Sequence, residues 1–187
     1  ICWSLVGSEM CIRDSAYSNL YGTECIGLRF FTVYGPWGRP DMALFKFTKN
    51  ILEDKEIDVY NNGNHSRDFT YVDDIVEGIY LSSISKKELI DSNFDSKDPS
   101  RSFCKSIIFN LGRGKPENLE DFIDEIENNL GKRAKRNLMP LQPGDVPDTS
   151  ADISGLKDFS GYEPKTSIKI GVKNFIDWYK EYYKVNL

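Results

Sequence analysis

The chain has 187 residues and a formal net charge of −5 at pH 7; 40% of its residues are hydrophobic and 28% are charged. This length and composition are typical of one soluble globular domain with a proper core. The negative charge excludes an electrostatic attraction of the whole chain to nucleic acid or acidic membranes, and no apolar run approaches the roughly 20 residues of a membrane span.

The cysteine and histidine content argues against a metal site. Four cysteines occur, none of them in a C-x-x-C pair, and the single histidine, His65, stands alone. A zinc site or a disulfide framework is therefore not expected. Isolated cysteines suit a reducing compartment, so we expect a cytoplasmic protein in which Cys25 and Cys104 are small buried apolar residues.

Residues 1–15, ICWSLVGSEMCIRDS, do not fit the rest of the chain. Their apolar positions follow neither the helix nor the strand period. A signal peptide is not favoured, because there is no basic amino-terminal region and Glu9, Arg13 and Asp14 interrupt any apolar stretch. We interpret residues 1–15 as a non-native, adaptor-derived segment and residues 16–187 as a partial domain.

The first elements of that domain are the end of a helix, a strand and a shaped loop. Residues 16–22 are typical of a helix end that Gly22 terminates. The apolar run over residues 26–33 stops at Tyr34-Gly35-Pro36, which predicts a buried strand followed by a loop. A glycine and a proline restrict the backbone on either side of Arg39. Since ligands of α/β proteins bind at strand ends, Arg39 is a binding candidate, with an ordinary surface ion pair as the alternative.

A helix is predicted to open at Pro40 and Asp41, because proline suits a first turn and aspartate complements the helix dipole. Its apolar residues have helical spacing and predict one buried face: Met42, Leu44, Phe45, Phe47, Ile51 and Leu52. A short strand over residues 57–60 follows, and the turn Asn61-Asn62-Gly63-Asn64 ends it.

Residues 67–72 are predicted to be extended and to lead into a helix that begins at Asp73-Asp74. Four apolar side chains of this helix are expected to face inward: Ile75, Val76, Ile79 and Tyr80. The polar residues 86–102 indicate a surface loop or insertion. A second apolar run over residues 106–111 predicts another strand.

The connection Gly112-Arg113-Gly114 has the outline of a dinucleotide-binding turn. Proline and glutamate stand where its third glycine would be expected, so a tight turn into a helix over residues 119–130 is the better interpretation. Gly131 terminates that helix. Three prolines predict a loop over residues 138–152, and a last helix over 167–183 has one apolar stripe: Ile168, Val172, Phe175, Ile176, Tyr179 and Tyr182.

Three segments, LRFFTVYGPWGRPDMALFKFT, IDVYNNG and RDFTYVDDIVEGI, resemble the carboxyl-terminal part of the NAD-dependent epimerase/dehydratase family of extended short-chain dehydrogenases. Within it the UDP-glucuronate 4-epimerases are the nearest group. The resemblance implies an α/β fold, namely the carboxyl-terminal part of a Rossmann-like domain with the small substrate-binding α/β subdomain. It also implies NAD as cofactor, a UDP-sugar substrate, no nucleic-acid or membrane partner, and a family-type homodimer whose interface is mostly missing here.

In the family reaction, NAD takes a hydride from C4 of the sugar. A tyrosine takes the hydroxyl proton, and a nearby lysine lowers the pKa of that tyrosine. The hydride then returns to the other face of the sugar. The family's Y-x-x-x-K pair and Gly-rich loop precede residue 16, and Tyr17 and Tyr21 have no lysine four residues on. We therefore expect no catalytic residue in this chain, no turnover by the chain alone, and poor solubility because sheet edges and faces are left uncovered.

Residue by residue, the resemblance implies an anchoring site for the nucleotide sugar. Phe31 lies beside the nicotinamide, while Thr32 and Arg39 meet the substrate carboxylate with a hydroxyl donor and a guanidinium fork. The turn at the helix start also contacts the substrate, through Asp41, Met42 and Ala43, although Asp41 would repel a diphosphate and is better placed as a cap.

The uracil and ribose end of the site comes from two later segments. Asp58, Val59 and Tyr60 match the strand that holds uracil, although a plain buried strand explains Val59 equally well. Arg67 matches the arginine that binds the diphosphate. Three residues of the late loop, the loop predicted over residues 138–152, match the remaining positions. Gln142 stands where some relatives have a second phosphate arginine, Asp145 matches the acid at the ribose hydroxyls, and Thr149 matches a position in the sugar pocket.

Alternative functions on the same scaffold are a UDP-glucuronate decarboxylase, a nucleotide-sugar 4,6-dehydratase, and a non-catalytic nucleotide-sugar-binding remnant. Thr32 together with the WGRPDM loop favours the epimerase.

Overall fold

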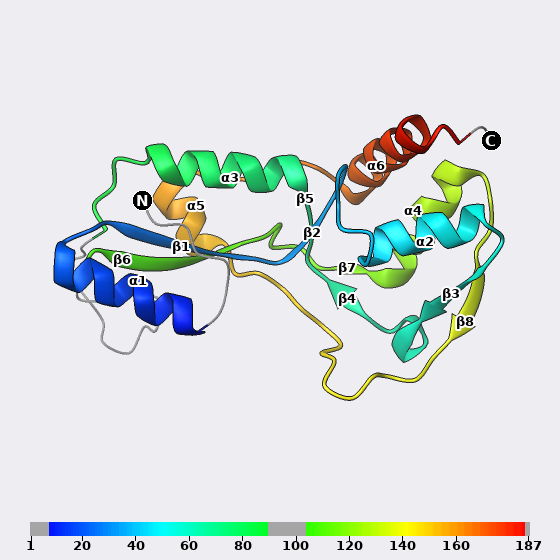
Figure 1. Cartoon of the computed structure of the whole chain (residues 1–187), viewed down its shortest axis with the longest axis horizontal. Helices are drawn as coiled ribbons and strands as arrows, with labels where there is room; N and C mark the ends of the chain where they lie inside the picture. The colour runs from blue at the N-terminus through cyan, green and yellow to red at the C-terminus, as the bar shows by residue number, and fades with distance from the viewer. Residues whose placement is uncertain (1–7, 90–103, 186–187) are drawn as a thin grey trace. The chain divides into compact units, whose positions relative to one another are not determined.

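The computed structural model describes residues 8–89 and 104–185, and these form two compact units. The first unit combines Ile1–Phe31, Asp73–Gly114 and Ala151–Pro164, and the second combines Thr32–Val72, Lys115–Ser150 and Lys165–Leu187. Each unit is therefore assembled from three separate stretches of sequence, as the colours of Figure 1 show.

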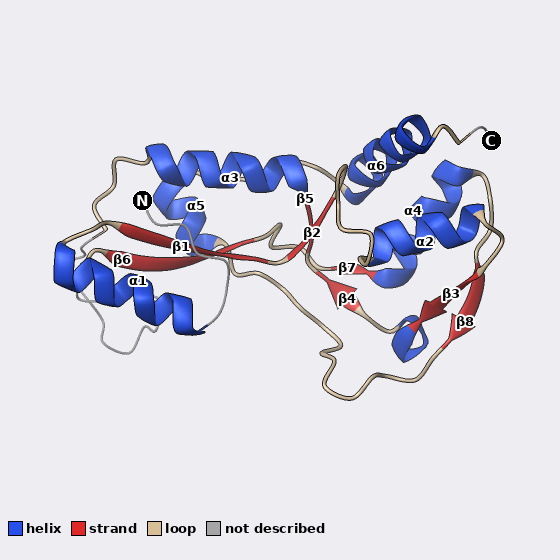
Figure 2. Cartoon of the chain, in the orientation of Figure 1, coloured by secondary structure: helices blue, strands red, loops and turns tan. Residues whose placement is uncertain are grey.

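The first unit is built on a parallel strand pair. Strand β1 (Cys25–Phe30) pairs with β6 (Ser106–Leu111), with Cys25 opposite Ser106 and Phe30 opposite Leu111. Figure 2 draws helix α1 (Ser8–Tyr21) on one side of the pair and α3 (Val72–Ile84) and α5 (Ser154–Ser160) on the other. A parallel pair with helices on both faces is the arrangement of α/β proteins, so the expected fold class is confirmed.

Helix α1 extends further back than the sequence indicated. It begins at Ser8, and Asp14 and Ser18 are buried. Gly22 ends the helix as expected, with φ at +66° and its N–H bonded to the Ser18 carbonyl oxygen. The adaptor origin of residues 1–15 stays a prediction, and residues 1–7 lie outside the described part of the chain.

Two expectations at the edges of the first unit are wrong. The strand predicted over residues 26–33 is two strands, because β1 ends at Phe30 and Thr32–Tyr34 form β2, which pairs with a different strand. On α3, Ile75 is buried, but Val76 is 57% and Tyr80 60% exposed.

The inward face of α3 instead contains Gly78, which packs against other buried groups of the first unit. A Cβ on Gly78 would lie 2.7 Å from Cδ1 of Leu111 and 3.0 Å from the Tyr162 ring. Because these neighbours come so close, the inward face of the helix must contain its smallest residue. The hydrophobicity of the helix residues alone does not predict this.

The second unit packs three helices against short strand pairs. Helix α4 (Leu119–Leu130) contacts both α2 (Ala43–Leu52) and α6 (Ile168–Tyr183). Strand β2 is parallel to β5 (Phe69–Tyr71), and β3 (Glu56–Val59) is parallel to β8 (Lys135–Leu138). Strand β4 (Ser66–Arg67) is antiparallel to β7 (Glu117–Asn118). The fully buried residues of this core include Ile51, Ile57, Val59, Phe122, Ile123, Ile126, Val172, Phe175 and Ile176.

The limits of α4 and α6 agree with the sequence signals, whereas α2 begins at Ala43 and not at Pro40 as predicted. Gly131 ends α4 with φ at +65°, and the Ser167 hydroxyl caps α6 by accepting from the Ile170 N–H. The turn η1 (Tyr60–Gly63) follows β3, with Asn61 and Asn62 at positive φ. Residues 139–150 contain no helix or strand, as their prolines predicted.

Several elements were not predicted from the sequence: β7, β8 and α5. The inward position assigned to Tyr182 is also wrong, since this residue is 53% exposed. Most of the loop predicted over residues 86–102 lies outside the described residues. No helix of the described residues is long and apolar enough to cross a membrane.

A glycine in the first turn of α6 allows Tyr34 to pack against that helix. A Cβ on Gly171 would collide with the Tyr34 hydroxyl and lie 2.7 Å from ring atoms Cε2 and Cζ. We expect Gly171→Ala to destabilise the chain by about 1–3 kcal/mol because the added methyl group would force the buried Tyr34 ring or the helix to shift, although alanine normally stabilises a helix relative to glycine. Urea unfolding checks this, with Lys169→Ala on the same turn as the control; a stabilised Gly171→Ala variant would contradict it.

Candidate functional site

A small pocket in the second unit brings together four of the residues proposed from the sequence: Thr32, Arg39, Met42 and Ala43. Its walls come from β2, the loop that follows it, the start of α2, and the aromatic side chains of Phe69, Phe122 and Phe175. This partly open pocket has a volume of about 40 Å³. That is room for water or a small group, not for a whole nucleotide sugar.

The loop after β2 has a backbone shape that holds the pocket edge in place. Gly35 has φ at +141°, and a Cβ there would lie 2.7 Å from Cγ1 of Val72. Trp37 has φ at +61°, a value that is uncommon for a non-glycine residue. The Gly38 N–H bonds the Gly35 carbonyl, and the Met42 N–H bonds the Arg39 carbonyl, both at 3.1 Å. These turns position the Arg39 backbone, as the sequence predicted.

The Arg39 side chain forms an ion pair with Asp41. Arg39 Nε donates to Asp41 Oδ1 at 3.0 Å and Nη2 to Oδ2, and both side chains are more than half exposed. The hydrogen bond raises the pKa of Arg39 and lowers the pKa of Asp41. Exposed pairs contribute little stability, so a ligand carboxylate can compete with Asp41 for the guanidinium.

The capping role assigned to Asp41 is wrong. Helix α2 begins at Ala43 with Met42 at its N-cap, no side chain caps it, and its first turn contains no acid. The carboxylate of Asp41 is instead held by Arg39, two residues earlier, because the Pro40 turn keeps both side chains outside the helix.

Phe31 lies between β1 and β2, and Thr32 is the first residue of β2. The Phe31 N–H bonds the Leu111 carbonyl at 3.2 Å within the first unit, and the Thr32 N–H bonds the Asp68 carbonyl at 3.1 Å within the second. Phe31 is half-buried at the carboxyl end of a parallel strand. A partly accessible aromatic ring at such a strand end fits a flat cofactor ring, and its contact with the nicotinamide stays a prediction.

Arg67 and Asp145 form a second cluster, although 78 positions separate them in the chain. Arg67 Nη2 donates to Asp145 Oδ1 at 3.0 Å, and Nη1 donates to the carbonyl oxygens of Pro147 at 2.7 Å and Ser66 at 3.1 Å. The Arg67 side chain is 19% exposed and that of Asp145 is 37% exposed. The diphosphate and ribose candidates are thus adjacent, and both are partly accessible.

Main-chain bonds hold the late loop alongside β4. The Ser66 N–H bonds the Pro147 carbonyl at 3.0 Å, and the Thr149 N–H bonds the Ser66 carbonyl at 3.1 Å. The Asp145 N–H bonds the Gln142 carbonyl at 3.1 Å. These bonds place Thr149 beside Ser66 and fold the Gln142 end of the loop back on Asp145.

The residues proposed to hold uracil have clear structural partners. Val59 is fully buried in the core. Asp58 Oδ1 accepts from Asn137 Nδ2 at 2.8 Å, across the β3–β8 pair. Tyr60 is half-buried at the start of η1. A buried strand therefore accounts for Val59, and the uracil contacts of all three residues stay predictions.

His65 was overlooked in the sequence, where it stands alone. In the structure its ring contacts the Asp145–Pro147 stretch: Nδ1 lies 3.1 Å from the Pro147 carbonyl oxygen and Nε2 lies 3.5 Å from Asp145 Oδ2. The available signal was its spacing of two residues from Arg67, which places both side chains on the same side of an extended segment.

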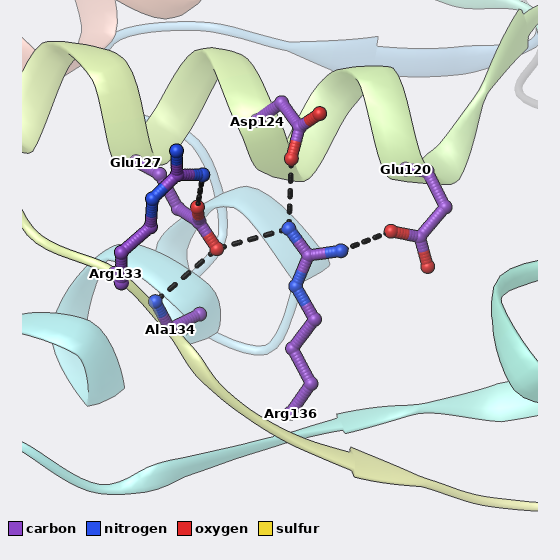
Figure 3. Close-up of polar contacts among 6 residues, drawn as sticks. All are labelled: Glu120, Asp124, Glu127, Arg133, Ala134 and Arg136. Carbon is purple, nitrogen blue, oxygen red and sulfur yellow. Dashed lines mark hydrogen bonds and ion pairs between the residues drawn. The ribbon is translucent and has the colours of Figure 1, made fainter.

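A buried carboxylate of α4 bonds two arginines, one in β8 and one just before it (Figure 3). Glu127, 3% exposed, accepts from Arg133 Nη1 at 2.5 Å, from Arg136 Nη2 at 3.0 Å and from the Ala134 N–H at 3.2 Å. Arg136 also bonds Glu120 and Asp124. Burial acts to raise the pKa of Glu127, but the arginine and backbone hydrogen bonds outweigh it and lower that pKa below its usual value.

Residues 7–91 match the model of the NAD dependent epimerase/dehydratase family. The chain is 54% identical over 171 residues to the protein CapI of Staphylococcus aureus, and 44% identical over 172 residues to UDP-glucuronate 4-epimerase 2 of Arabidopsis thaliana. The chain is thus similar to the NAD-dependent epimerase/dehydratase family over residues 7–91, and to individual UDP-glucuronate 4-epimerases over 90% of its length. The family match begins at residue 7, and so includes part of residues 1–15, the segment interpreted as non-native.

The chain spans only part of the length of these relatives. Its matches cover 90% of this chain in both cases, but 51% of CapI and 39% of the Arabidopsis enzyme. The crystal structure of the UDP-glucuronic acid 4-epimerase from Bacillus cereus, in complex with UDP-glucuronic acid and NAD, superposes with a TM-score of 0.77 at 31% identity. That superposition covers 94% of this chain and 50% of the epimerase chain. The chain is thus similar to about half of a Rossmann-like, NAD-dependent epimerase.

Proposed function

We propose that this chain is the substrate-anchoring portion of a UDP-glucuronate 4-epimerase, binding the UDP and the sugar carboxylate while C4 is oxidised and reduced. The observation that carries the proposal is the adjacent Arg67 and Asp145, a cation suited to a diphosphate beside an acid suited to ribose hydroxyls. Guanidinium geometry matches phosphate oxygens, and a carboxylate accepts from hydroxyl groups. Similarity to UDP-glucuronate 4-epimerases over 90% of the chain supports it.

The pocket residues supply the selectivity for a uronic acid in this proposal. The Thr32 hydroxyl and the Arg39 guanidinium are donors on one pocket, and a carboxylate needs donors alone. NAD supplies the hydride acceptor and donor when it is bound to the whole protein. The residues of this chain bind and orient the UDP-sugar, so that the anchored nucleotide stays in place while the sugar turns.

We expect Arg39→Ala to weaken the binding of UDP-glucuronate about tenfold, the loss of one charge-assisted contact, and to leave UDP-glucose binding unchanged. Isothermal titration of the 187-residue chain with both nucleotide sugars measures this. Asp41→Asn should act in the opposite direction, because it removes the competing carboxylate from Arg39.

Lys49→Ala is the matched control, since it removes an exposed cation of α2 that is not among the residues lining the pocket. If Arg39→Ala loses equal affinity for UDP-glucuronate and UDP-glucose, Arg39 does not bind the carboxylate. Failure of the unchanged chain to bind either compound would overturn the proposed function.

A further inference from the structure

His65 is a buried group whose two ring contacts both lead to the loop that carries Asp145. Its side chain is 5% exposed. Nδ1 lies 3.1 Å from the Pro147 carbonyl oxygen. Nε2 is buried and has no hydrogen-bond partner among the described residues, and Asp145 Oδ2 lies 3.5 Å away.

The chemistry of these contacts limits what each ring nitrogen can do. A carbonyl oxygen only accepts, so Nδ1 must be the donor to Pro147. Without a proton, Nε2 would present a lone pair toward an acceptor carboxylate inside the protein, which is unfavourable. Nε2 lies 3.5 Å from Asp145 Oδ2, so a small approach of the carboxylate would bring the two groups within hydrogen-bond distance.

A partner for Asp145 is needed once the nucleotide binds. In the structure Arg67 donates to Asp145 Oδ1, while Oδ2 faces His65. A diphosphate that attracts the Arg67 guanidinium removes that donor and leaves Asp145 with a charge to be matched. His65 lies two residues before Arg67 and already contacts the loop on both sides of Val146.

We propose that His65 is a positioning residue that holds Asp145 toward the ribose while Arg67 turns to the diphosphate. This role rests on the proposed function of Arg67 and Asp145. His65 touches neither substrate nor cofactor in it and acts through Asp145 alone.

The first test uses the fact that His65 is the only histidine of the sequence. In ¹⁵N spectra of the full chain, the ring signals belong to this residue without ambiguity. We expect Asp145→Asn to shift the Nε2 signal and UDP to shift it further in the unchanged chain. Asp148→Asn, an equal loss of charge at an exposed position of the same loop, should leave it in place. Equal spectra for Asp145→Asn and the unchanged chain would overturn the proposal.

The second test separates the two ring nitrogens. Glutamine places an amide donor near the Nε2 position and asparagine places one near Nδ1. We expect His65→Gln to bind UDP within about twofold of the unchanged chain and His65→Asn to bind about tenfold more weakly, with thermal unfolding confirming that both fold. A folded His65→Asn variant with unchanged UDP affinity would show that Nε2 does not position Asp145.

The two proposals fail in different ways. Absence of UDP binding by the unchanged chain overturns the proposed function and, with it, the role of His65. If the unchanged chain binds UDP but Asp145→Asn does not shift the Nε2 signal, only the role of His65 is overturned.

Discussion

Arg67→Ala is expected to weaken UDP binding about 100-fold, because a guanidinium that bonds phosphate oxygens contributes about 2–3 kcal/mol through charge-assisted hydrogen bonds. Arg67→Lys keeps the charge but loses the planar fork, so it should recover only part of the affinity. Titration of the 187-residue chain with UDP measures both variants. Uridine provides the decisive comparison: it has no diphosphate, so its binding should respond little to either substitution.

The structural role of Arg67 requires a separate control. Arg67 also bonds Pro147 and Asp145, and its removal loosens the late loop. Thermal unfolding of Arg67→Ala therefore accompanies the titrations, and Arg29→Ala, which removes an exposed arginine from β1, is the matched variant. Parallel losses for UDP and uridine in a folded Arg67→Ala protein would place Arg67 in the framework of the loop rather than at the diphosphate.

Glu127→Ala is expected to destabilise the chain by about 3 kcal/mol, the usual result of removing one partner from a buried ion pair. The substitution leaves the Ala134 N–H without its acceptor and takes one carboxylate from Arg133 and Arg136. Urea unfolding of Glu127→Ala measures this, with Glu125→Ala on the same helix as the control. Equal stability of the two variants would mean that the network in Figure 3 does not hold β8 to α4.

The pH dependence of stability should identify the same group. The folded-state pKa of Glu127 lies below the ordinary value of 4.5. A carboxyl whose folded pKa is lowered stabilises the fold above its unfolded pKa, and this contribution is lost as the pH falls through the folded value. The unchanged chain should therefore lose thermal stability more steeply below about pH 4.5 than Glu127→Gln does. Parallel curves for the two proteins would contradict this assignment.

Local patterns in the sequence were sufficient for the elements whose limits are set by neighbouring residues. Helix α4, ended by Gly131, and α6, capped by Ser167, follow from apolar spacing and terminal residues within one segment. Strand β6 follows from a short segment rich in apolar residues, SIIFNL. The resemblance to the NAD-dependent epimerase/dehydratase family rests on segments between Leu28 and Ile79, and each of them is itself a continuous stretch.

Only the tertiary structure decided how distant segments combine. The ion pair of Arg67 with Asp145 and the contacts of His65 with the same loop depend on Ser66 pairing with Pro147 and Thr149, about 80 residues further along. The inward face of α3 was set by the space beside Leu111 and Tyr162, which only Gly78 fits. Pairing and close packing between remote segments leave no period in either segment, so the composition of each one alone could not predict them.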